Sequence, residues 1–244
     1  MALTLTDVSG EAVLLAGGAA AILLQVADPA VARGVAAQSN FADRPLDRLH
    51  GTLTYLYVTA FGTPEEAREV ARAVGGVHRP VPGATDAQLQ LWVAATLYAT
   101  AMRVRELVFG VDDPAEADAL LAEYAVVGTA LGLPRSAWPA DRASFDSYWA
   151  GRELNVGDDA RAIAAALLHP ARPRWLRALM PTIRVVTAGL LDADLREAYG
   201  LEFDARRFDR LVARTRAIYP KLPARLRRWP ARYYLTRYRR RRRT

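Results

Sequence analysis

The segment TDAQLQLWVAATLYATAMRVRELVFG, residues 85–110, decides the fold class of this chain. It is rich in apolar side chains, and no helix-stopping residue interrupts it before Gly110. A segment of this length and composition predicts one long helix, central to the core and ending at Gly110. The elements on either side are then expected to be helices that share this core.

Most of the remaining chain shows a helical pattern with explicit start and stop signals. In GTPEEAREVARAVGG, Thr63 is a favoured N-cap residue, Pro64 suits the first helical position, and paired glycines end the pattern. Asp113 and Pro114 repeat this arrangement. The sequence has no convincing period-two strand and no Asn-Gly hairpin signal. The predicted helices lie near residues 10–26, 29–37, 44–60, 64–74, 86–108, 114–131, 141–153, 158–168, 173–189, 192–199 and 203–219.

The organisation of the chain indicates one domain. No linker rich in serine and glycine divides it, and no repeat of fixed length is visible. Because 52% of the 244 residues are hydrophobic, there is ample material for a buried core. We predict an all-α protein, with a single globular domain of about ten helices over residues 1–220 and an arginine-rich C-terminal segment over residues 221–244.

The apolar run from Ala12 to Leu24 is the stretch to test as a targeting or membrane segment. It is shorter than the roughly 20 residues that cross a bilayer, and Asp7 and Glu11 stand where a signal peptide carries positive charge. We interpret it as a buried helix and expect a cytoplasmic protein, with peripheral membrane contact as an alternative. The absence of cysteine excludes disulfides, thiolate metal ligands and a cysteine nucleophile.

Positive charge is concentrated at the C-terminal end. Residues 205–244 hold sixteen basic residues and one acid, although the net charge of the whole chain is only +7. This asymmetry indicates an anionic partner, or alternatively a solvated tail of an arginine-rich protein. Arginines alternate there with Trp229, Tyr233, Tyr234 and Tyr238, which fits peripheral contact with anionic lipid. The same composition fits nucleic acid, but no DNA-reading element supports that interpretation, and the sequence disfavours it.

Few catalytic motifs are compatible with this sequence. It contains no His-Glu-x-x-His, EF-hand or Gly-x-Ser-x-Gly pattern, and Gly17-Gly18 lies inside an apolar helix, where it indicates tight packing. The chain has three histidines, His50, His78 and His169, so a multi-histidine metal site is hard to build. A cofactor that needs one protein ligand, such as haem, remains compatible.

A series of short motifs runs through most of the chain, from about residue 10 to residue 235. In this order and spacing, the chain resembles the family of latex-clearing protein, rubber oxygenase and the mycophenolic-acid-pathway oxygenase. The motifs that carry the resemblance are LLAGGAAAILLQVADPAVARGVAAQSNF, RLHGTLTYLYVTAFGTPEEA, VHRPVPG, LQLWVAATL, LLAEYAVVGTALGLPRSAWPADRASFDSYW, TAGLLDADLREAYGLEF and LPARLRRWPARYYLTR.

The resemblance implies an all-α oxidoreductase that binds haem b and uses dioxygen as an oxygenase. The family's axial histidine corresponds to His78, and its Arg-x-x-x-Thr helix corresponds to Arg48 and Thr52 at the haem pocket. The implied substrate is a hydrophobic small molecule, such as an isoprenoid or a lipid. Helical geometry separates His50 from this set, because it is two residues from Arg48 and from Thr52, about 200° round the helix. His169 precedes a proline at a helix end, where it is expected to have a capping role.

Two positions depart from the family pattern and keep alternatives open. Gly51 stands where the rubber-oxygenase branch has a lysine, and Ala94 stands where many relatives have a histidine. The first alternative is a cofactor-free helical binding protein that retains the family fold. The second is a peripheral binder of anionic lipid or nucleic acid through residues 205–244.

Overall fold

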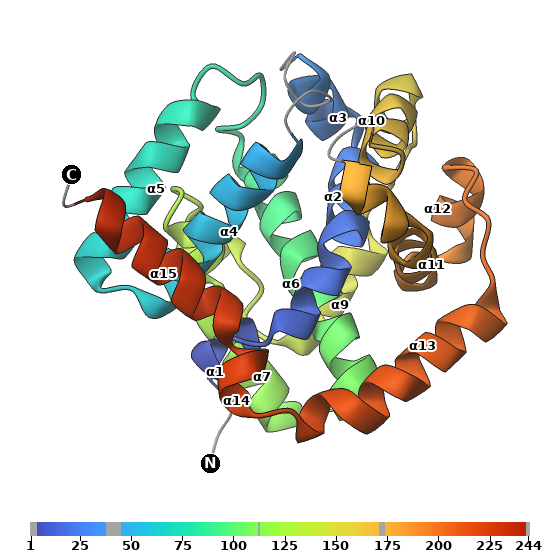
Figure 1. Ribbon diagram of the computed structural model, residues 1–244. Coiled ribbons are helices and arrows are strands. Elements are labelled where there is room, and N and C mark those ends of the chain that lie inside the picture. Colours follow the sequence, from blue (N-terminus) through green and yellow to red (C-terminus); the bar gives the residue numbers. More distant parts are fainter. Residues whose placement is uncertain (1–3, 38–44, 112, 171–173, 243–244) are drawn as a thin grey trace.

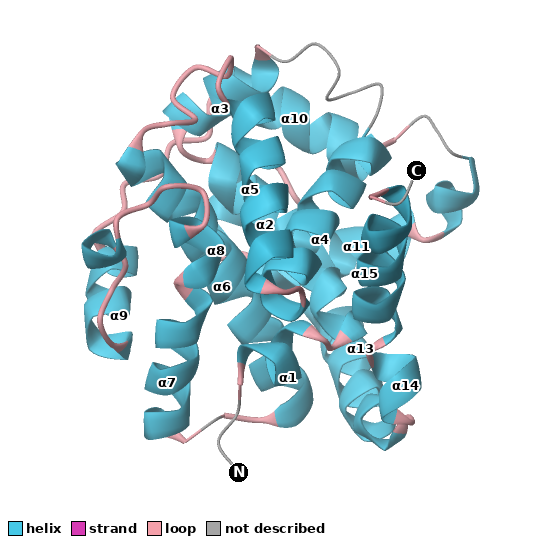
Figure 2. Cartoon of the chain, turned by 90° about the vertical axis from the view of Figure 1, so that its left-hand side faces the viewer, coloured by secondary structure: helices cyan, strands magenta, loops and turns pink. Residues whose placement is uncertain are grey.

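The computed structural model describes residues 4–37, 45–111, 113–170 and 174–242. Within these ranges the chain consists of helices and connecting loops, without a strand, so the predicted all-α class is confirmed (Figure 2). The elements in chain order are α1 (Leu5–Ser9), η1 (Ala12–Gly17), α2 (Gly18–Val26), α3 (Pro29–Ala36), α4 (Pro45–Phe61), α5 (Pro64–His78), α6 (Ala87–Phe109), α7 (Pro114–Tyr124), α8 (Val126–Thr129), η2 (Arg135–Ala137), α9 (Arg142–Ala150), α10 (Asp158–Leu168), η3 (Arg174–Ala178), α11 (Met180–Leu190), α12 (Ala193–Ala198), α13 (Ala205–Ile218), η4 (Tyr219–Lys221), α14 (Ala224–Arg227) and α15 (Trp229–Arg241), where η denotes a 3₁₀ segment.

Helix α6 is the central element that residues 85–110 predict. Asp86 caps its start by accepting hydrogen bonds from the N–H groups of Gln88 and Leu89, and Gly110 ends it with a φ of 101°, which glycine adopts without strain. Trp92 and Tyr98 on this helix are 0% and 1% exposed. They belong to two different apolar clusters, so α6 joins two halves of one core.

Aromatic rings fill the first of these clusters. Tyr98 meets Tyr124, Trp138 and Phe145 edge to face, with ring centroids 5.3, 6.2 and 4.9 Å away. Such pairs add about 0.5–1.5 kcal/mol each beyond their burial. The second cluster joins α2, α3, α10 and α11 to Trp92. Both clusters are made by residues far apart in the chain, which is why the helices form a single fold (Figure 1).

The predicted helix over residues 10–26 is divided into η1 and α2 at the two glycines. A Cβ on Gly17 would lie 3.3 Å from the Val104 side chain and 3.4 Å from the Thr100 carbonyl of α6, so the predicted tight packing is confirmed there. Gly18 faces open space instead. Short interruptions of this kind turn the predicted ten or so helices into fifteen α-helices and four 3₁₀ segments among the described residues.

The α2 part of the apolar N-terminal run is buried in the core, as predicted, whereas Leu15 of η1 is 38% exposed. Ala20, Ala21, Leu23 and Leu24 on α2 are all at most 4% exposed. Within the described ranges, no single helix combines the length and hydropathy needed to cross a membrane; Ala12–Val26 and Pro29–Ala36 reach them only as a pair, bent by 105°.

Helices α4 and α5 form an antiparallel pair joined by Gly62 and Thr63 (Figure 1). The N-cap predicted at Thr63 is confirmed as a capping box: the Glu66 N–H donates to the Thr63 hydroxyl, and the Thr63 N–H donates to the Glu66 carboxylate at 2.9 Å. Tyr55 and Val58 of α4, together with Val70 of α5, point into the first apolar cluster.

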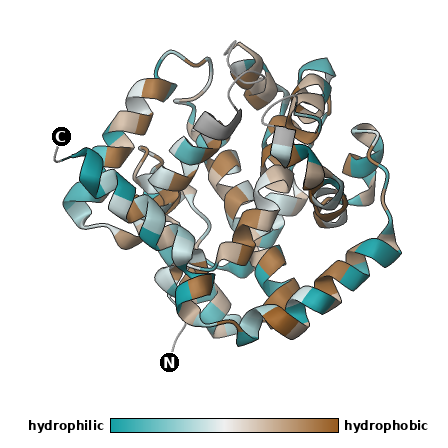
Figure 3. Ribbon diagram, viewed as in Figure 1, coloured by the Kyte–Doolittle hydropathy of each residue, from teal (hydrophilic) through white to brown (hydrophobic). Residues whose placement is uncertain are grey.

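The arginine-rich segment is helical and packs on the body of the protein as far as it is described. Ala231 and Tyr234 of α15 are each 5% exposed and contact Leu53 and Tyr57 of α4. The preceding helix α13 is amphipathic, and polar and apolar turns alternate along it in Figure 3. Its apolar side is anchored by Phe208, which packs against Gly189 of α11.

Candidate functional site

The inward side of α4 carries Thr52, Tyr55 and Thr59, because residues three, four and seven positions apart share one side of a helix. Tyr55 and Thr59 are 5% and 8% exposed, whereas Thr52 is exposed although it lies on the same side. Arg48 lies one turn before Thr52 in α4, and its side chain is outside the described part of the structure. Among the described side chains, burial on this side of α4 therefore falls off between Tyr55 and Thr52.

The inward side of α5 opens in the same way at its C-terminal end. Val70 is 4% exposed and Val74 is half-buried, but Val77, two turns after Val70, is 65% exposed. His78 follows Val74 by four residues, is the last residue of α5 and is also exposed. The inward side of α5 thus ends in an apolar side chain and an imidazole that are not covered by the core.

These two open sides lie at the same end of the helix pair. Helices α4 and α5 have 17 and 15 residues and run antiparallel, so the start of α4 and the end of α5 are at the same end. Glycines leave room there, because a Cβ on Gly51, Gly75 or Gly76 would meet no atom within 4 Å. The topology therefore brings the Arg48–Thr52 turn and His78 to one end of the molecule, as the family resemblance implies.

Tyr55 fixes the position of α4 just below this open end. Its hydroxyl donates a hydrogen bond to the Val127 carbonyl of α8, and burial raises the pKa of the Tyr55 phenol above its ordinary value. No sequence motif marks Tyr55 or Val77 as a site residue. A helical wheel continued from Thr52 and from His78 places both of them on the inward sides, which is the signal that could have found them.

His50 lies on the other side of α4, as the 200° offset from Arg48 and Thr52 predicts. Its Nδ1 is 2.6 Å from the hydroxyl of Tyr234 on α15, and the two rings are 5.8 Å apart. The side chain is half-buried in this contact. His50 therefore contributes to the packing of α15 on α4.

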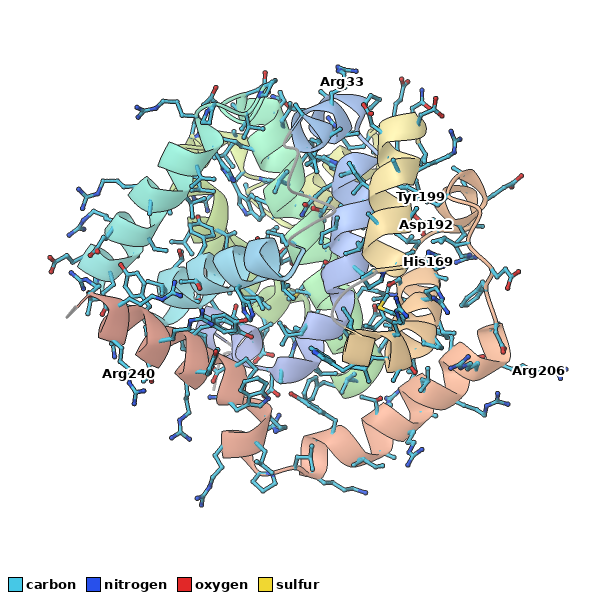
Figure 4. The ribbon with its side chains drawn as sticks, turned by 45° about the horizontal axis from the view of Figure 1, so that its top comes forward. Arg33, His169, Asp192, Tyr199, Arg206 and Arg240 are labelled. Atoms are coloured by element: carbon cyan, nitrogen blue, oxygen red, sulfur yellow. The ribbon has the colours of Figure 1, made fainter. Side chains whose placement is uncertain are left out.

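His169 ends helix α10, where it is the C-cap residue (Figure 4). Its backbone N–H donates to the Ala165 carbonyl, and its side chain is exposed. The three histidines thus belong to three separate places in the fold. Across the described ranges, no group of three or more His, Cys, Asp or Glu side chains could hold a metal ion.

The residues at the open end fit a cofactor that takes one protein ligand. The exposed imidazole of His78 supplies a nitrogen donor, and the Thr52 hydroxyl supplies a hydrogen-bonding group. Val77, 65% exposed and one residue before His78, supplies an apolar contact of the kind that a porphyrin face needs. This donor set suits haem better than a bare metal ion, which requires several convergent ligands.

Position 94, where the family resemblance implies a histidine, is part of the packed core in this chain. Ala94 is 4% exposed, and its Cβ would be 3.5 Å from a Cβ placed on Gly128 of α8. Ala94 is therefore a buried member of the first apolar cluster.

Comparison with known proteins agrees with this architecture. Residues 6–217 match the family model described as ER-bound oxygenase mpaB/B'/rubber oxygenase, catalytic domain. The chain is 33% identical over 219 residues to the uncharacterised protein Mb2261 of Mycobacterium bovis and to the uncharacterised protein Rv2237 of Mycobacterium tuberculosis, and each match covers 80% of this chain and 84% of the relative. No solved structure matches the chain. The chain belongs to the mpaB and rubber oxygenase family of catalytic domains.

Proposed function

We propose that this protein is a haem b-dependent oxygenase that acts with dioxygen on a hydrophobic small molecule. Membership of a family of oxygenase catalytic domains supports an oxidoreductase of this class. The observation that carries the haem assignment is the exposed His78 at the C-terminal end of α5, the same end of the helix pair as the exposed Thr52. His78 and Thr52 are both exposed, although buried residues one or two turns away on the same sides of α5 and α4 pack into the core.

Each residue has a distinct role in this proposal. His78 would hold the iron through one imidazole nitrogen, and a hydrogen bond to the other ring nitrogen would set its orientation. The guanidinium of Arg48 suits a propionate carboxylate, because it offers paired N–H donors to two oxygens. The Thr52 hydroxyl, one turn further along α4, can donate or accept a hydrogen bond beside a bound oxygen molecule or substrate. Haem, when bound, would supply the reaction with dioxygen.

A hydrophobic substrate is favoured by the side chains that border the open end. Leu49 and Val77 remain 40% and 65% exposed, although burying a leucine or valine side chain is worth about 1.5–3 kcal/mol. An isoprenoid or lipid-like molecule would cover these side chains and gain part of that energy. We therefore propose an apolar substrate whose reacting bond is brought near Thr52, without assigning its chain length.

The test compares histidine variants after loading with haem. We expect the wild-type protein to give a Soret band, and we expect His78→Ala to lose it or shift it, because the axial nitrogen is removed. His169→Ala is the matched control, since His169 is also an exposed histidine at a helix end but lies on α10. Its spectrum should equal that of the wild type. Oxygen uptake with a polyisoprenoid then tests the substrate class.

Two results would contradict the proposal. A His78→Ala spectrum identical to that of the wild type would show that another group holds the iron. A wild-type protein without a Soret band after loading would instead favour a cofactor-free helical binding protein. Gly51 stands where the rubber-oxygenase branch has a lysine, and this difference favours the cofactor-free binding protein.

A further inference from the structure

The arginines of the C-terminal helices form two sets with different surroundings. The first set is bound to carboxylates of the protein body and holds α14 and α15 in place. Glu11 and Glu66, the acceptors of two of these pairs, have side chains only 4% and 7% exposed. The pairs are Arg227–Glu11 at 2.7 Å, Arg228–Asp7 at 3.1 Å, Arg239–Glu66 at 2.8 Å and Arg242–Glu69 at 2.8 Å.

The second set faces solvent. Arg225 on α14 and Arg232 and Arg240 on α15 are exposed, and they pair with no carboxylate among the described residues. Figure 4 shows Arg240 projecting away from the body of the protein. These three side chains thus contribute positive charge that the protein itself does not neutralise.

Large apolar side chains share this surface with the second set. Trp229 and Tyr233 are 53% and 44% exposed, and they line a shallow groove of about 580 Å³ along α15 together with Arg232 and Arg240. Leu226, on the neighbouring helix α14, is 57% exposed. We call the surface made by Arg225, Leu226, Trp229, Arg232, Tyr233 and Arg240 the outward face. Contiguous exposed apolar groups bounded by charge are typical of a surface that another molecule covers.

We propose that the outward face docks on the surface of an anionic membrane. The arginines would bind lipid phosphates, and Trp229 and Tyr233 would lie at the level of the headgroups, where amphipathic aromatic rings are favoured. Leu226 would reach the boundary of the acyl chains. This inference does not rest on haem binding, because the outward face is separate from the open end of α4 and α5. It also involves a part of the chain beyond residue 217, where the family match ends.

Charge and composition favour a lipid surface over nucleic acid. Exposed aliphatic side chains also occur nearby in the sequence at Leu222 and Ile218, 38% and 49% exposed, and nucleic-acid phosphates and bases gain little from aliphatic contacts. The rings of Trp229 and Tyr233 meet each other edge to face, 6.0 Å apart at 63°, instead of standing open as a stacking platform. Exposed aliphatic side chains, together with arginines that bind no carboxylate of the described residues, are complementary to a phospholipid headgroup layer.

Docking in this way requires no unfolding of the segment. The opposite side of α15 stays buried, with Ala231 and Tyr234 packed on α4 and the first arginine set bound to its carboxylates. The outward face is therefore a rigid surface, and its side chains can be changed without removing the helix from the protein.

The test uses the full chain and co-sedimentation with vesicles. We expect binding to vesicles of phosphatidylcholine mixed with phosphatidylglycerol, weakening as salt rises, and little binding to phosphatidylcholine alone. Arg232→Gln combined with Arg240→Gln should weaken binding by at least about tenfold, since each arginine near an anionic leaflet contributes to attraction. The matched control is Arg206→Gln with Arg210→Gln, which removes two exposed arginines from α13, where Arg206 lies far from Arg240 (Figure 4). This control should stay within about threefold of the wild type.

A second readout detects insertion directly. Brominated lipid should quench part of the tryptophan fluorescence of the wild type, and Trp229→Phe should remove that quenching. Equal binding to neutral and anionic vesicles, or equal losses in the two arginine pairs, would overturn the proposal. Binding of the chain to a single-stranded oligonucleotide, lost in Arg232→Gln/Arg240→Gln, with no vesicle binding, would replace the membrane with nucleic acid. Protein prepared with and without haem should behave alike in these assays, so failure of the haem assignment would not affect them.

Discussion

At the residue scale, Glu66 connects two helices that are far apart in sequence. Its carboxylate accepts hydrogen bonds from the Thr63 N–H at 2.9 Å and from the Arg239 guanidinium at 2.8 and 3.0 Å. These bonds, that from Arg239 first, lower the pKa of Glu66 from 4.5 to about 2. Because the folded value lies below the ordinary one, the stabilisation is fully present above about pH 4.5 and is lost as the pH falls through about 2.

Glu66→Gln should therefore reduce the unfolding free energy near neutral pH by about 1–3 kcal/mol, because it removes the charge that Arg239 and the capping box bind. The variant should also show a flatter loss of stability than the wild type between about pH 4.5 and about pH 2. Urea unfolding followed by circular dichroism across this range measures both effects. Glu65→Gln is the control, since the Glu65 side chain is 76% exposed and 3.9 Å from Arg242, and it should change stability by less than about 0.5 kcal/mol. Parallel pH profiles for Glu66→Gln and the wild type would contradict the assignment.

At the element scale, the crossing of α11 and α13 depends on one glycine. A Cβ on Gly189 would overlap the ring of Phe208, which is 8% exposed. The approach of the two helices is thus set by the missing side chain. It places α13 along the edge of the molecule, where it leads through η4 to α14 and the outward face (Figure 1).

Gly189→Ala should destabilise the protein by about 1–3 kcal/mol, because the added methyl group must push the Phe208 ring or the helix away. Alanine is the better helix former, so intrinsic propensity alone predicts the opposite sign. The matched control is Gly18→Ala at the start of α2, where a Cβ would meet no atom within 4 Å and the backbone is already helical. That control should be neutral or more stable by up to about 1 kcal/mol. Thermal unfolding decides the question, and a Gly189→Ala protein as stable as Gly18→Ala would refute the packing argument.

At the scale of the whole molecule, the arginine-rich segment is a structural part of the fold. The inner side of α15 covers Leu53 and Tyr57 of α4, which are 8% and 4% exposed, and α14 supplies the partner of the buried Glu11. A membrane or nucleic-acid assay on a chain cut after Pro220 would thus measure the loss of structure together with the loss of charge. Substitutions on the outward face avoid this problem.

Deletion of residues 221–244 should lower the unfolding free energy by more than about 3 kcal/mol, because it exposes an apolar side of α4 and leaves Glu11 and Glu66 without their arginines. The deleted protein should bind a hydrophobic dye and unfold at a lower temperature. Arg232→Gln/Arg240→Gln is the control, since it removes charge from the outward face without touching the inner side, and its melting temperature should not change. An unaltered melting temperature after the deletion would show that α15 contributes nothing to the fold.

Local sequence signals predicted the elements whose ends depend on neighbouring residues. Thr63 and Pro64 start α5, and Gly110 ends α6. The 200° offset of His50 puts it on the side of α4 away from Thr52. Each of these features depends on a few residues in one helix. For the candidate site, the residues Arg48, Thr52 and His78 came from the family resemblance, and their roles stay predictions. Their placement at one end of the α4–α5 pair follows from the short connection between two helices of similar length.

What the sequence by itself determined is the all-α class, the central helix and the ends of the capped helices, because helix caps and periodicity act within a few residues. Only the tertiary structure decided where the core stops below Thr52, which histidine faces Tyr234, and which arginines hold α15 and which face solvent. The pair of Glu66 and Arg239 shows the reason. Their bond joins positions 173 residues apart, so it depends on the path of the whole chain and leaves no local trace in the sequence.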